Sequence, residues 1–148
     1  MSDIRTGMPL LARHEGEWVG TYTEVDLDGK VLDTHASHLF CQFPTEGVYD
    51  YYQINKYIWA DGRTDERHFP AVYRDGRIWW DNDLIFGSAW EVDSKTVLLT
   101  WTRKEMPGTY LYEMIQLSDD GQHRARTWHW FTDDQLTKRT IIKERRHA

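Results

Sequence analysis

Aromatic residues alternate with polar ones along this chain, beginning with the run from Gly16 to Tyr22. A repeat of two places side chains on one face of a β-strand, whereas one face of a helix repeats about every 3.6 residues. The sequence holds 8 Trp, 8 Tyr and 5 Phe in 148 residues, more rings than the core of a small β-sandwich needs. The pattern therefore predicts a β-barrel whose rings line a cavity for a flat small molecule.

Turn signals divide the chain into nine or ten strand-like runs. Asp-Gly pairs such as Asp28-Gly29 and Asp75-Gly76 favour tight turns, because both residues reach positive φ. The break at 81–83 is the weakest, and its Asp81 and Asp83 are interpreted as turn residues or as carboxylates at a pocket rim. The runs between the breaks span 17–27, 30–43, 48–59, 64–73, 77–82, 84–92, 96–104, 109–118, 122–132 and 136–145.

This many strands in one small sheet leave two exposed edges unless the sheet closes. No helix of crossover length separates the runs, which disfavours a parallel sheet. We therefore predict an all-β fold, a single antiparallel up-and-down β-barrel of 8–10 strands in one domain spanning 1–148. A short helix over 9–14, started by Pro9 and ended by Gly16, is expected to plug one end, and residues 1–8 are expected to be irregular.

Composition narrows the possible partners and location. The net charge of −6 disfavours nucleic acid, and no stretch approaches the ~18 apolar residues of a membrane span. The N-terminus lacks the basic and apolar segments of a secretory signal. The single Cys41 forms no internal disulfide and is expected to be a small buried apolar side chain. These features predict a cytoplasmic protein, and an apolar outer surface would allow a homodimer.

A short motif at the start of the first strand resembles a known family. Gly16-x-Trp18, placed after a short helix, resembles the Gly-x-Trp signature of the lipocalin and calycin superfamily. A wider pattern comprises His14-x-Gly16-x-Trp18-x-Gly20-x-Tyr22 and the closing Glu144-Arg145-Arg146. It is similar to small bacterial calycin-like domains, including those related to phycobiliprotein lyases. The resemblance implies the barrel fold and does not extend to a bilin ligand.

The same resemblance implies an arrangement at one end of the barrel. In the superfamily the signature tryptophan lies at the closed end, which here places Trp18. A basic residue of the last strand usually packs over that ring, and Arg139 or Arg145 would supply it through a cation–π contact.

Alternation sorts the residues of each strand into two faces. If Trp18 points inward, Tyr22 and Glu24 do so too, and Glu24 then needs a partner or a raised pKa. In 48–59 the face with Tyr51, Gln53 and Asn55 is predicted to point inward, because Lys56 on the other face fits solvent. In 30–43 one face carries Ala36, His38 and Phe40, and the other carries His35, Ser37, Leu39 and Cys41. We take the face with His38 as inward.

The later strands carry the densest rings. Because Trp79 and Trp80 are adjacent, at least one of them points into the barrel. Trp101 shares a face with Val97, Leu99 and Arg103, and Tyr112 shares one with Tyr110 and Met114. A further face joins Arg126, Trp128 and Trp130. An inward Arg126 or Arg139 would favour an anionic group on the ligand, because a guanidinium binds carboxylate in a bidentate fork.

The candidate site residues follow from these faces. Histidine moves protons near neutral pH, so the candidate catalytic residues are His38, Tyr51 and His129. The candidate ligand-binding residues are Tyr22, Glu24, Asn55, His68, Trp80, Trp101, Tyr112, Arg126, Trp128 and Arg139. Since the chain has no phosphate loop, zinc-binding helix, Cys-x-x-Cys pair or nucleophile elbow, no metal and no cofactor are expected. A haem held by an inward His129 is a minor alternative.

Two functions of different classes remain. The first is a binding protein that holds a hydrophobic, aromatic small molecule in the barrel. The second is a cofactor-independent lyase, isomerase or cyclase that uses a histidine with a tyrosine or carboxylate in the same cavity. Acid–base chemistry of this kind leaves no cofactor motif, so the missing motifs do not separate the two.

Overall fold

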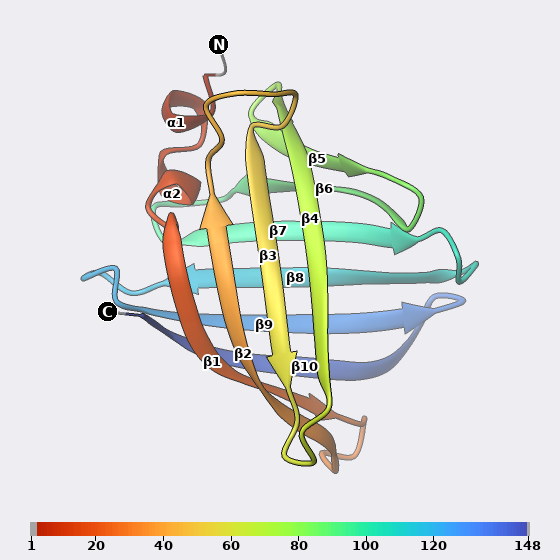
Figure 1. Cartoon of the computed structure of the whole chain (residues 1–148). Coiled ribbons are helices and arrows are strands. Elements are labelled where there is room, and N and C mark those ends of the chain that lie inside the picture. The colour runs from red at the N-terminus through yellow and green to blue at the C-terminus, as the bar shows by residue number, and fades with distance from the viewer. Residues whose placement is uncertain (1–2, 148) are drawn as a thin grey trace.

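The computed structural model describes residues 3–147, which form a closed barrel of antiparallel strands (Figure 1). Each strand pairs with its sequence neighbours, and β1 pairs with β10 to close the sheet. The predicted fold is confirmed, and each expected run matches an observed strand to within three residues. The strands are β1 (Gly16–Val25), β2 (Val31–Gln42), β3 (Tyr51–Ile58), β4 (Thr64–Arg74), β5 (Arg77–Asp81), β6 (Ile85–Glu91), β7 (Thr96–Arg103), β8 (Thr109–Leu117), β9 (His123–Thr132) and β10 (Gln135–Arg146).

Residues with positive φ form the tight turns that the sequence predicts. Asp75 (φ 54°) and Gly76 (φ 77°) link β4 to β5, and Asp133 (φ 51°) and Asp134 (φ 65°) link β9 to β10. Both central residues of such a turn have positive φ, a region that Gly, Asn and Asp reach most easily. These short connections keep each strand beside the next and produce the simple meander order.

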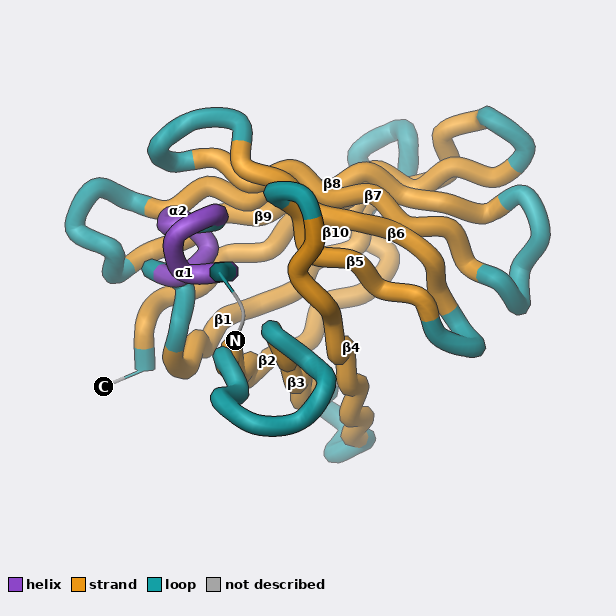
Figure 2. The backbone as a smooth tube through the Cα atoms, turned by 90° about the horizontal axis from the view of Figure 1, so that it is seen from above, coloured by secondary structure: helices purple, strands orange, loops and turns teal. Residues whose placement is uncertain are grey.

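Two single-turn helices precede the barrel, α1 (Ile4–Gly7) and α2 (Pro9–Ala12). The second confirms the helix expected from Pro9. The irregular segment expected over 1–8 is wrong at α1, because packing of Ile4 and Met8 into the core stabilises one helical turn; Met1 and Ser2 lie outside the described residues. Both helices lie where β1 begins (Figure 2). Across residues 3–147, no helix combines the length and apolar character needed to cross a membrane.

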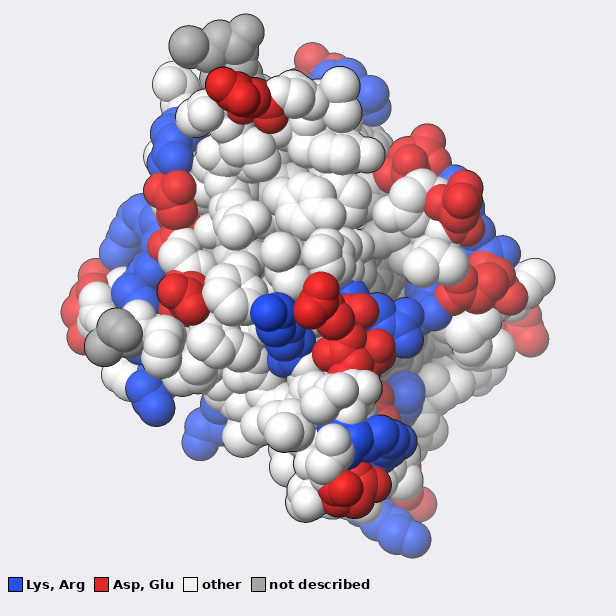
Figure 3. Space-filling model, in the orientation of Figure 1, with Lys and Arg blue, Asp and Glu red and all other residues white. Residues whose placement is uncertain are grey.

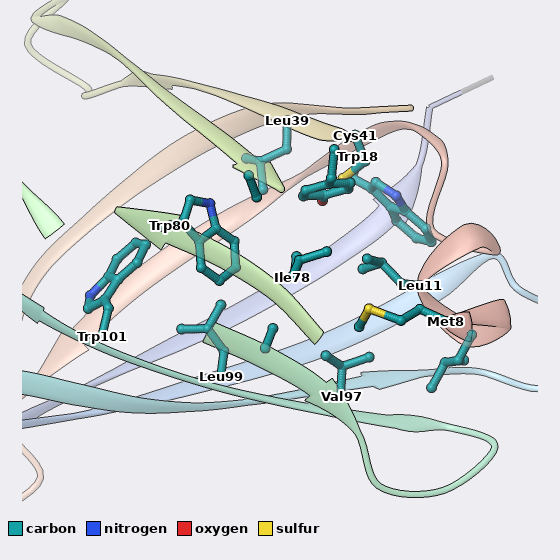
Figure 4. Close-up of a cluster of buried hydrophobic side chains, with 14 of the residues drawn as sticks. Met8, Leu11, Trp18, Leu39, Cys41, Ile78, Trp80, Val97, Leu99 and Trp101 are labelled. Carbon is teal, nitrogen blue, oxygen red and sulfur yellow. The ribbon is translucent and has the colours of Figure 1, made fainter. Parts of the chain in front are cut away.

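The strands form two layers that cross steeply, β1–β4 in front and β6–β10 behind (Figure 1). Between them lies one apolar core that reaches from the helices to the middle of the barrel (Figure 4). Met8 and Leu11 bring the helices into this core, so the end beside α2 is closed by side chains. Adjacent tryptophans do face opposite sides, with Trp80 buried inside and Trp79 outside.

The face predicted for 30–43 is wrong. Leu39 and Cys41 are fully buried inside the barrel, so His38 points outward with Ala36 and Phe40. The cause lies in the neighbouring strand: Trp18 pairs directly with Leu39, and directly paired residues share a face of the sheet. Cys41 is a buried free thiol, as expected.

Most charged side chains lie on the outside of the barrel. On the face shown in Figure 3 they gather toward the edges and the lower half, while the upper middle carries no Lys, Arg, Asp or Glu. A shallow hollow of about 680 Å³ lies elsewhere on the exterior, over β1, β9 and β10. No aromatic side chain of Trp, Tyr or Phe lines that hollow.

Candidate functional site

A cavity of about 370 Å³ opens at the end of the barrel away from the helices. The last residues of β1 and β3 and the first residues of β2 and β4 form one side, and β6, β7, β9 and β10 form the other. Small-molecule sites typically measure roughly 300–1,000 Å³, so this mouth cavity is of the right size for a compact ligand.

Aromatic rings make up the walls of the mouth cavity. Tyr22 packs edge-on against Tyr57 (5.0 Å between ring centroids) and Trp128 (5.5 Å), and Trp128 packs against Trp130 (5.7 Å). Each comes from an inward position of its strand, so the period-two pattern places all of them in the interior. Rings arranged this way offer flat apolar surfaces on which a planar guest stacks.

A histidine–carboxylate pair lies at the edge of these rings. His35 Nδ1 lies 2.7 Å from Asp33 Oδ2, and Trp59 Nε1 donates to the same carboxylate at 3.0 Å. Burial opposes ionisation of Asp33, but the hydrogen bonds from His35 and Trp59 lower the pKa of its carboxyl group overall. The ionised carboxylate fixes the proton on Nδ1 of His35. Its Nε2 makes no hydrogen bond to any part of the chain that the structure describes.

The remaining charged groups of the mouth are already paired. Glu24 accepts a hydrogen bond from Lys138 at 3.0 Å, and Lys138 lies over the ring of Trp130. Arg67 donates to Asp65 at 2.9 Å, and Arg103 pairs with Glu105 at the rim. The partner required by a half-buried Glu24 is therefore Lys138.

Three rings form a floor beneath the mouth cavity. Phe69, Trp101 and Trp128 line both the mouth and a second, inner cavity of about 30 Å³ on the side of the helices. Phe69 stacks on Trp101 at 5.2 Å, and Trp80 meets Trp101 edge-on at 6.0 Å. We call Phe69, Trp101 and Trp128 the ring floor. It separates the mouth from a deeper region with a different chemistry.

Four fully buried charges lie behind the ring floor. Arg126 donates through Nε to Glu113 at 2.6 Å and through Nη1 to Glu144 at 3.2 Å, while Arg124 donates through Nε to Glu144 at 2.6 Å. Their side chains are at most 4% exposed. The two positive and two negative charges compensate one another, which lowers the free-energy cost of burying them.

Tyr22 and His14 complete the polar groups around this cluster. Arg126 donates to the Tyr22 hydroxyl at 2.9 Å, and burial raises the pKa of that phenol well above its usual range. His14 Nδ1 accepts from Arg124 at 3.1 Å. Burial and the charge of Arg124 hold the pKa of His14 well below its ordinary value, so the imidazole is neutral and carries its proton on Nε2.

The signature tryptophan lies at the closed end, between two guanidinium groups. Trp18 is completely buried and donates to the His14 carbonyl at 2.9 Å. Arg146 lies 4.4 Å from its ring centroid, and Arg124 lies 4.8 Å from it. The basic residue expected over Trp18 is thus present, but the expectation of Arg139 or Arg145 is wrong, because odd-numbered residues in this half of β10 face outward.

Most of the predicted site residues lie inside the barrel. In the mouth cavity they are Tyr22, Glu24, Trp101 and Trp128, and around the inner cavity they are Tyr51, Asn55, Trp80, Arg126 and again the two floor tryptophans. Tyr51 belongs to a chain of hydrogen bonds that runs from its hydroxyl through Gln53 and Asn55 to the Tyr57 hydroxyl. The face predicted for 48–59 is therefore confirmed, and this polar chain joins the two cavities along β3.

Other predicted site residues lie on the outer face and line neither cavity. His38 pairs with Glu17 at 2.9 Å, and His129 pairs with Tyr112 across β8 and β9, where Tyr112 is 53% exposed. Because His129 points outward, it does not reach the interior, where the haem alternative would need it. Arg139 pairs with His129 in the sheet and shares its outward face. These predictions are wrong because each residue has the parity opposite to the inward residues of its own strand.

His68 borders the mouth, but its ring is engaged on the outside. Its Nδ1 lies 2.8 Å from the Tyr52 hydroxyl and its Nε2 lies 2.7 Å from Glu66. Both nitrogens are therefore occupied by exposed partners. In the meander order β3 lies between β2 and β4, so His68 on β4 is not on a strand adjacent to that of His38.

Sequence reasoning missed several residues of the site. The alternation pattern places His35 on the outer face of 30–43, and it gives no reason to single out Glu113, because a single carboxylate in a strand usually faces solvent. The available signal was the register of β2 against β1, where Tyr22 pairs with His35.

One group of side chains could hold a metal ion, and it lies outside the barrel. Glu17, His38 and His147 present ligand atoms within 4.8 Å of one another. Among residues 3–147, no such group of histidine, cysteine and carboxylate side chains lies in the mouth cavity.

Comparison with known proteins gives matches of structure alone. No family model matches the chain, and no curated protein matches it in sequence. The S-type phycobiliprotein lyase CPES from Guillardia theta superposes with a TM-score of 0.76 at 10% identity, covering 100% of this chain and 99% of that one. The protein Rv2717c from M. tuberculosis gives a TM-score of 0.68 at 10% identity, covering 96% and 98%.

A longer protein also matches. A DUF3598-family protein of unknown function from Nostoc punctiforme gives a TM-score of 0.71 at 16% identity, covering 93% of this chain, which spans about half (49%) of that protein. Likeness at this identity establishes a shared fold, and it confirms at that level the resemblance inferred from Gly16 and Trp18. The chain therefore has a calycin-like barrel fold, the fold of the S-type phycobiliprotein lyase.

Proposed function

We propose that this protein binds a flat, hydrophobic small molecule in the mouth cavity. The observation that carries the proposal is a cavity of about 370 Å³, open to solvent on one side and walled by aromatic rings from separate strands. A cleft lined by rings with a few fixed polar groups is the usual form of a small-molecule site. A solved protein of the same fold is named a phycobiliprotein lyase, which supports a role of this fold around small molecules.

The walls indicate how such a ligand would be held. Tyr22, Tyr57 and Trp128 meet edge-on, so a guest that stacks on one ring has its edge directed at another. The charged groups around the mouth are paired with each other, which leaves no unpaired guanidinium to select an anion. The proposed ligand is therefore apolar and aromatic rather than strongly charged.

Titration with a panel of polycyclic aromatic compounds tests the proposal, with intrinsic tryptophan fluorescence and calorimetry as readouts. We expect Tyr57→Ala to weaken binding about tenfold, because it removes a wall ring of the mouth. Tyr112→Ala is the matched control, since that ring is exposed on the outer face. The proposal fails if no compound binds the wild type, or if both variants weaken binding equally.

The geometry of His35 favours a second function, cofactor-independent acid–base catalysis in the same cavity. Its Nδ1 is fixed by Asp33 at 2.7 Å, which leaves Nε2 as the basic nitrogen of a residue that lines the cavity. The dyad lies against Tyr22, whose ring stacks on His35 at 5.2 Å. A lyase or isomerase would use this imidazole to remove and return one proton on the bound ring compound.

Turnover measured against pH separates this second function from simple binding. If the protein is an enzyme, His35→Gln abolishes turnover and its pH dependence while ligand affinity remains. His38→Gln is the control, because His38 lies outside the barrel and also pairs with a carboxylate, through Nε2 to Glu17. Equal loss of turnover in both variants, or retained turnover in His35→Gln, would remove His35 as the base.

A further inference from the structure

Two tryptophans of the ring floor have indole N–H groups without any acceptor. The nitrogens of Trp101 and Trp128 are buried and form no hydrogen bond with the described residues, and Trp101 is only 8% exposed. We propose that these two donors form a recognition subsite for a neutral ring carbonyl, so that the ligand is a planar aromatic ketone or related carbonyl compound. The inference rests on the proposed binding function and names its ligand class.

The other tryptophans show that the two floor residues are unusual within this chain. Five of the eight donate to protein acceptors: Trp18 to His14, Trp59 to Asp33, Trp79 to Arg74, Trp80 to Phe69 and Trp130 to Thr140. Buried donors almost always have a partner, because water given up must be replaced. Two unpartnered donors on rings that line the same cavity therefore point to an acceptor supplied by a ligand.

The chemistry of the indole decides what kind of atom can fill the subsite. An indole nitrogen only donates, so a hydroxyl or amine hydrogen on the guest would find no partner there. A carbonyl oxygen has two lone pairs, so it can accept from either nitrogen, and from both where they point at one position. Figure 4 shows the Trp101 nitrogen on the edge of the ring that faces away from the helices, toward the mouth.

The charges behind the floor favour a neutral acceptor over a carboxylate. Arg126 lies 5.7 Å from the Trp128 ring, but its Nε is already bonded to Glu113 and its Nη1 to Glu144 and Tyr22. Two carboxylates balance the two guanidinium groups of that cluster, so a third anion at the floor would stay uncompensated. A carbonyl dipole accepts the same hydrogen bonds without this cost.

Both nitrogens are buried, so a carbonyl reaches them only when a neighbouring side chain moves. Phe69 stacks on Trp101 at 5.2 Å and borders both cavities, which makes it the ring of the floor best placed to move. Entry of the carbonyl then replaces a ring–ring contact by a hydrogen bond and a new stacking contact.

Calorimetric titration with 9-fluorenone and fluorene tests the subsite, since the two probes share their ring system and differ in the carbonyl oxygen. We expect the wild type to bind 9-fluorenone about 3- to 10-fold more tightly per hydrogen bond. Trp101→Phe and Trp128→Phe should each reduce this ratio while changing fluorene affinity less. Trp130→Phe is the matched control, because its N–H already bonds to Thr140.

The outcomes distinguish the subsite from the binding function itself. If both probes bind but the ratio is unchanged in Trp101→Phe and Trp128→Phe, the subsite is refuted and the mouth remains a binding site. If neither probe binds, both fail. Tighter binding of fluorene-9-carboxylate than of 9-fluorenone would overturn the neutral acceptor. In the wild type, ¹⁵N spectra should show two indole N–H signals that shift downfield with 9-fluorenone and not with fluorene. This measurement does not depend on the folding of any variant.

Discussion

Arg126 donates through Nε to the Glu113 carboxylate at 2.6 Å, and both side chains are nearly inaccessible to water. The pair crosses from β9 to the inner face of β8, directly behind the ring floor. Each charge there depends on its partner, because a single buried ion costs far more than a buried pair.

We predict that Glu113→Leu and Arg126→Met each lower the free energy of unfolding by about 3–5 kcal/mol, because each strands an opposite charge. The double variant should lose less than either single variant, since it removes one charge of each sign. Urea denaturation of the four proteins measures this coupling. Additive losses would show that the pair is not energetically coupled.

Mild acid should destabilise the barrel through His14. The pKa of His14 is lowered in the folded state, so below about pH 6.5 the unfolded chain binds a proton that the folded barrel refuses. Stability is therefore present above the ordinary histidine pKa and falls as the pH drops below it, by up to ~1.4 kcal/mol per pH unit. In His14→Asn, whose amide oxygen still accepts from Arg124, the slope of stability between pH 7 and 5.5 should be smaller. An unchanged slope would assign it to other groups.

Arg146→Met should open the closed end of the barrel. Besides lying over Trp18, Arg146 donates to the carbonyls of Arg13, Glu15 and Gly121, so its loss removes both a cation–π contact and the links from β10 to the segment after α2. We expect a loss of about 1.5–3 kcal/mol in chemical denaturation. Arg145→Met, one residue away on the outer face, should change stability by less than about 0.5 kcal/mol. Equal effects would contradict the inward role of Arg146.

Gly87→Ala should displace Trp101 of the ring floor. A Cβ at Gly87 would lie 2.5 Å from the Trp101 Cβ and collide with the Thr100 carbonyl, so β7 must shift and Trp101 with it. We expect about 1–3 kcal/mol of destabilisation and weaker binding of aromatic probes. Gly62→Ala strains a turn (φ 89°) where a Cβ meets no atom, so it should lower the melting temperature without changing probe affinity. Unchanged affinity for aromatic probes in Gly87→Ala would show that the ring floor is not part of the binding site.

The strand positions could be predicted because their limits are local. A turn such as Asp75-Gly76 needs positive φ, and residue type alone reveals where that is possible. The face of β2 could not be predicted, since Leu39 and Phe40 are equally suited to burial. The register against Trp18 decides between them, and a slip of one residue turns every side chain over.

The buried charges illustrate the other limit of sequence reasoning. Arg124, Arg126, Glu113 and Glu144 stand at alternate positions of strands, where charged residues ordinarily mark the solvent face. They become compatible with the interior only because three strands, β8, β9 and β10, bring them within hydrogen-bonding distance of one another. Likewise, Arg146 rather than Arg139 or Arg145 covers Trp18 because of a parity that the run of basic residues does not reveal.

The ring floor separates two groups of side chains that have different roles. The side chains that hold the sheet closed lie on one side of it, whereas those that would meet a guest lie on the other. Exchanging residues such as Tyr57 or Trp130 can therefore alter guest preference without touching the charges that anchor the opposite end. A lineage built on this plan can diversify its guests while its scaffold stays the same.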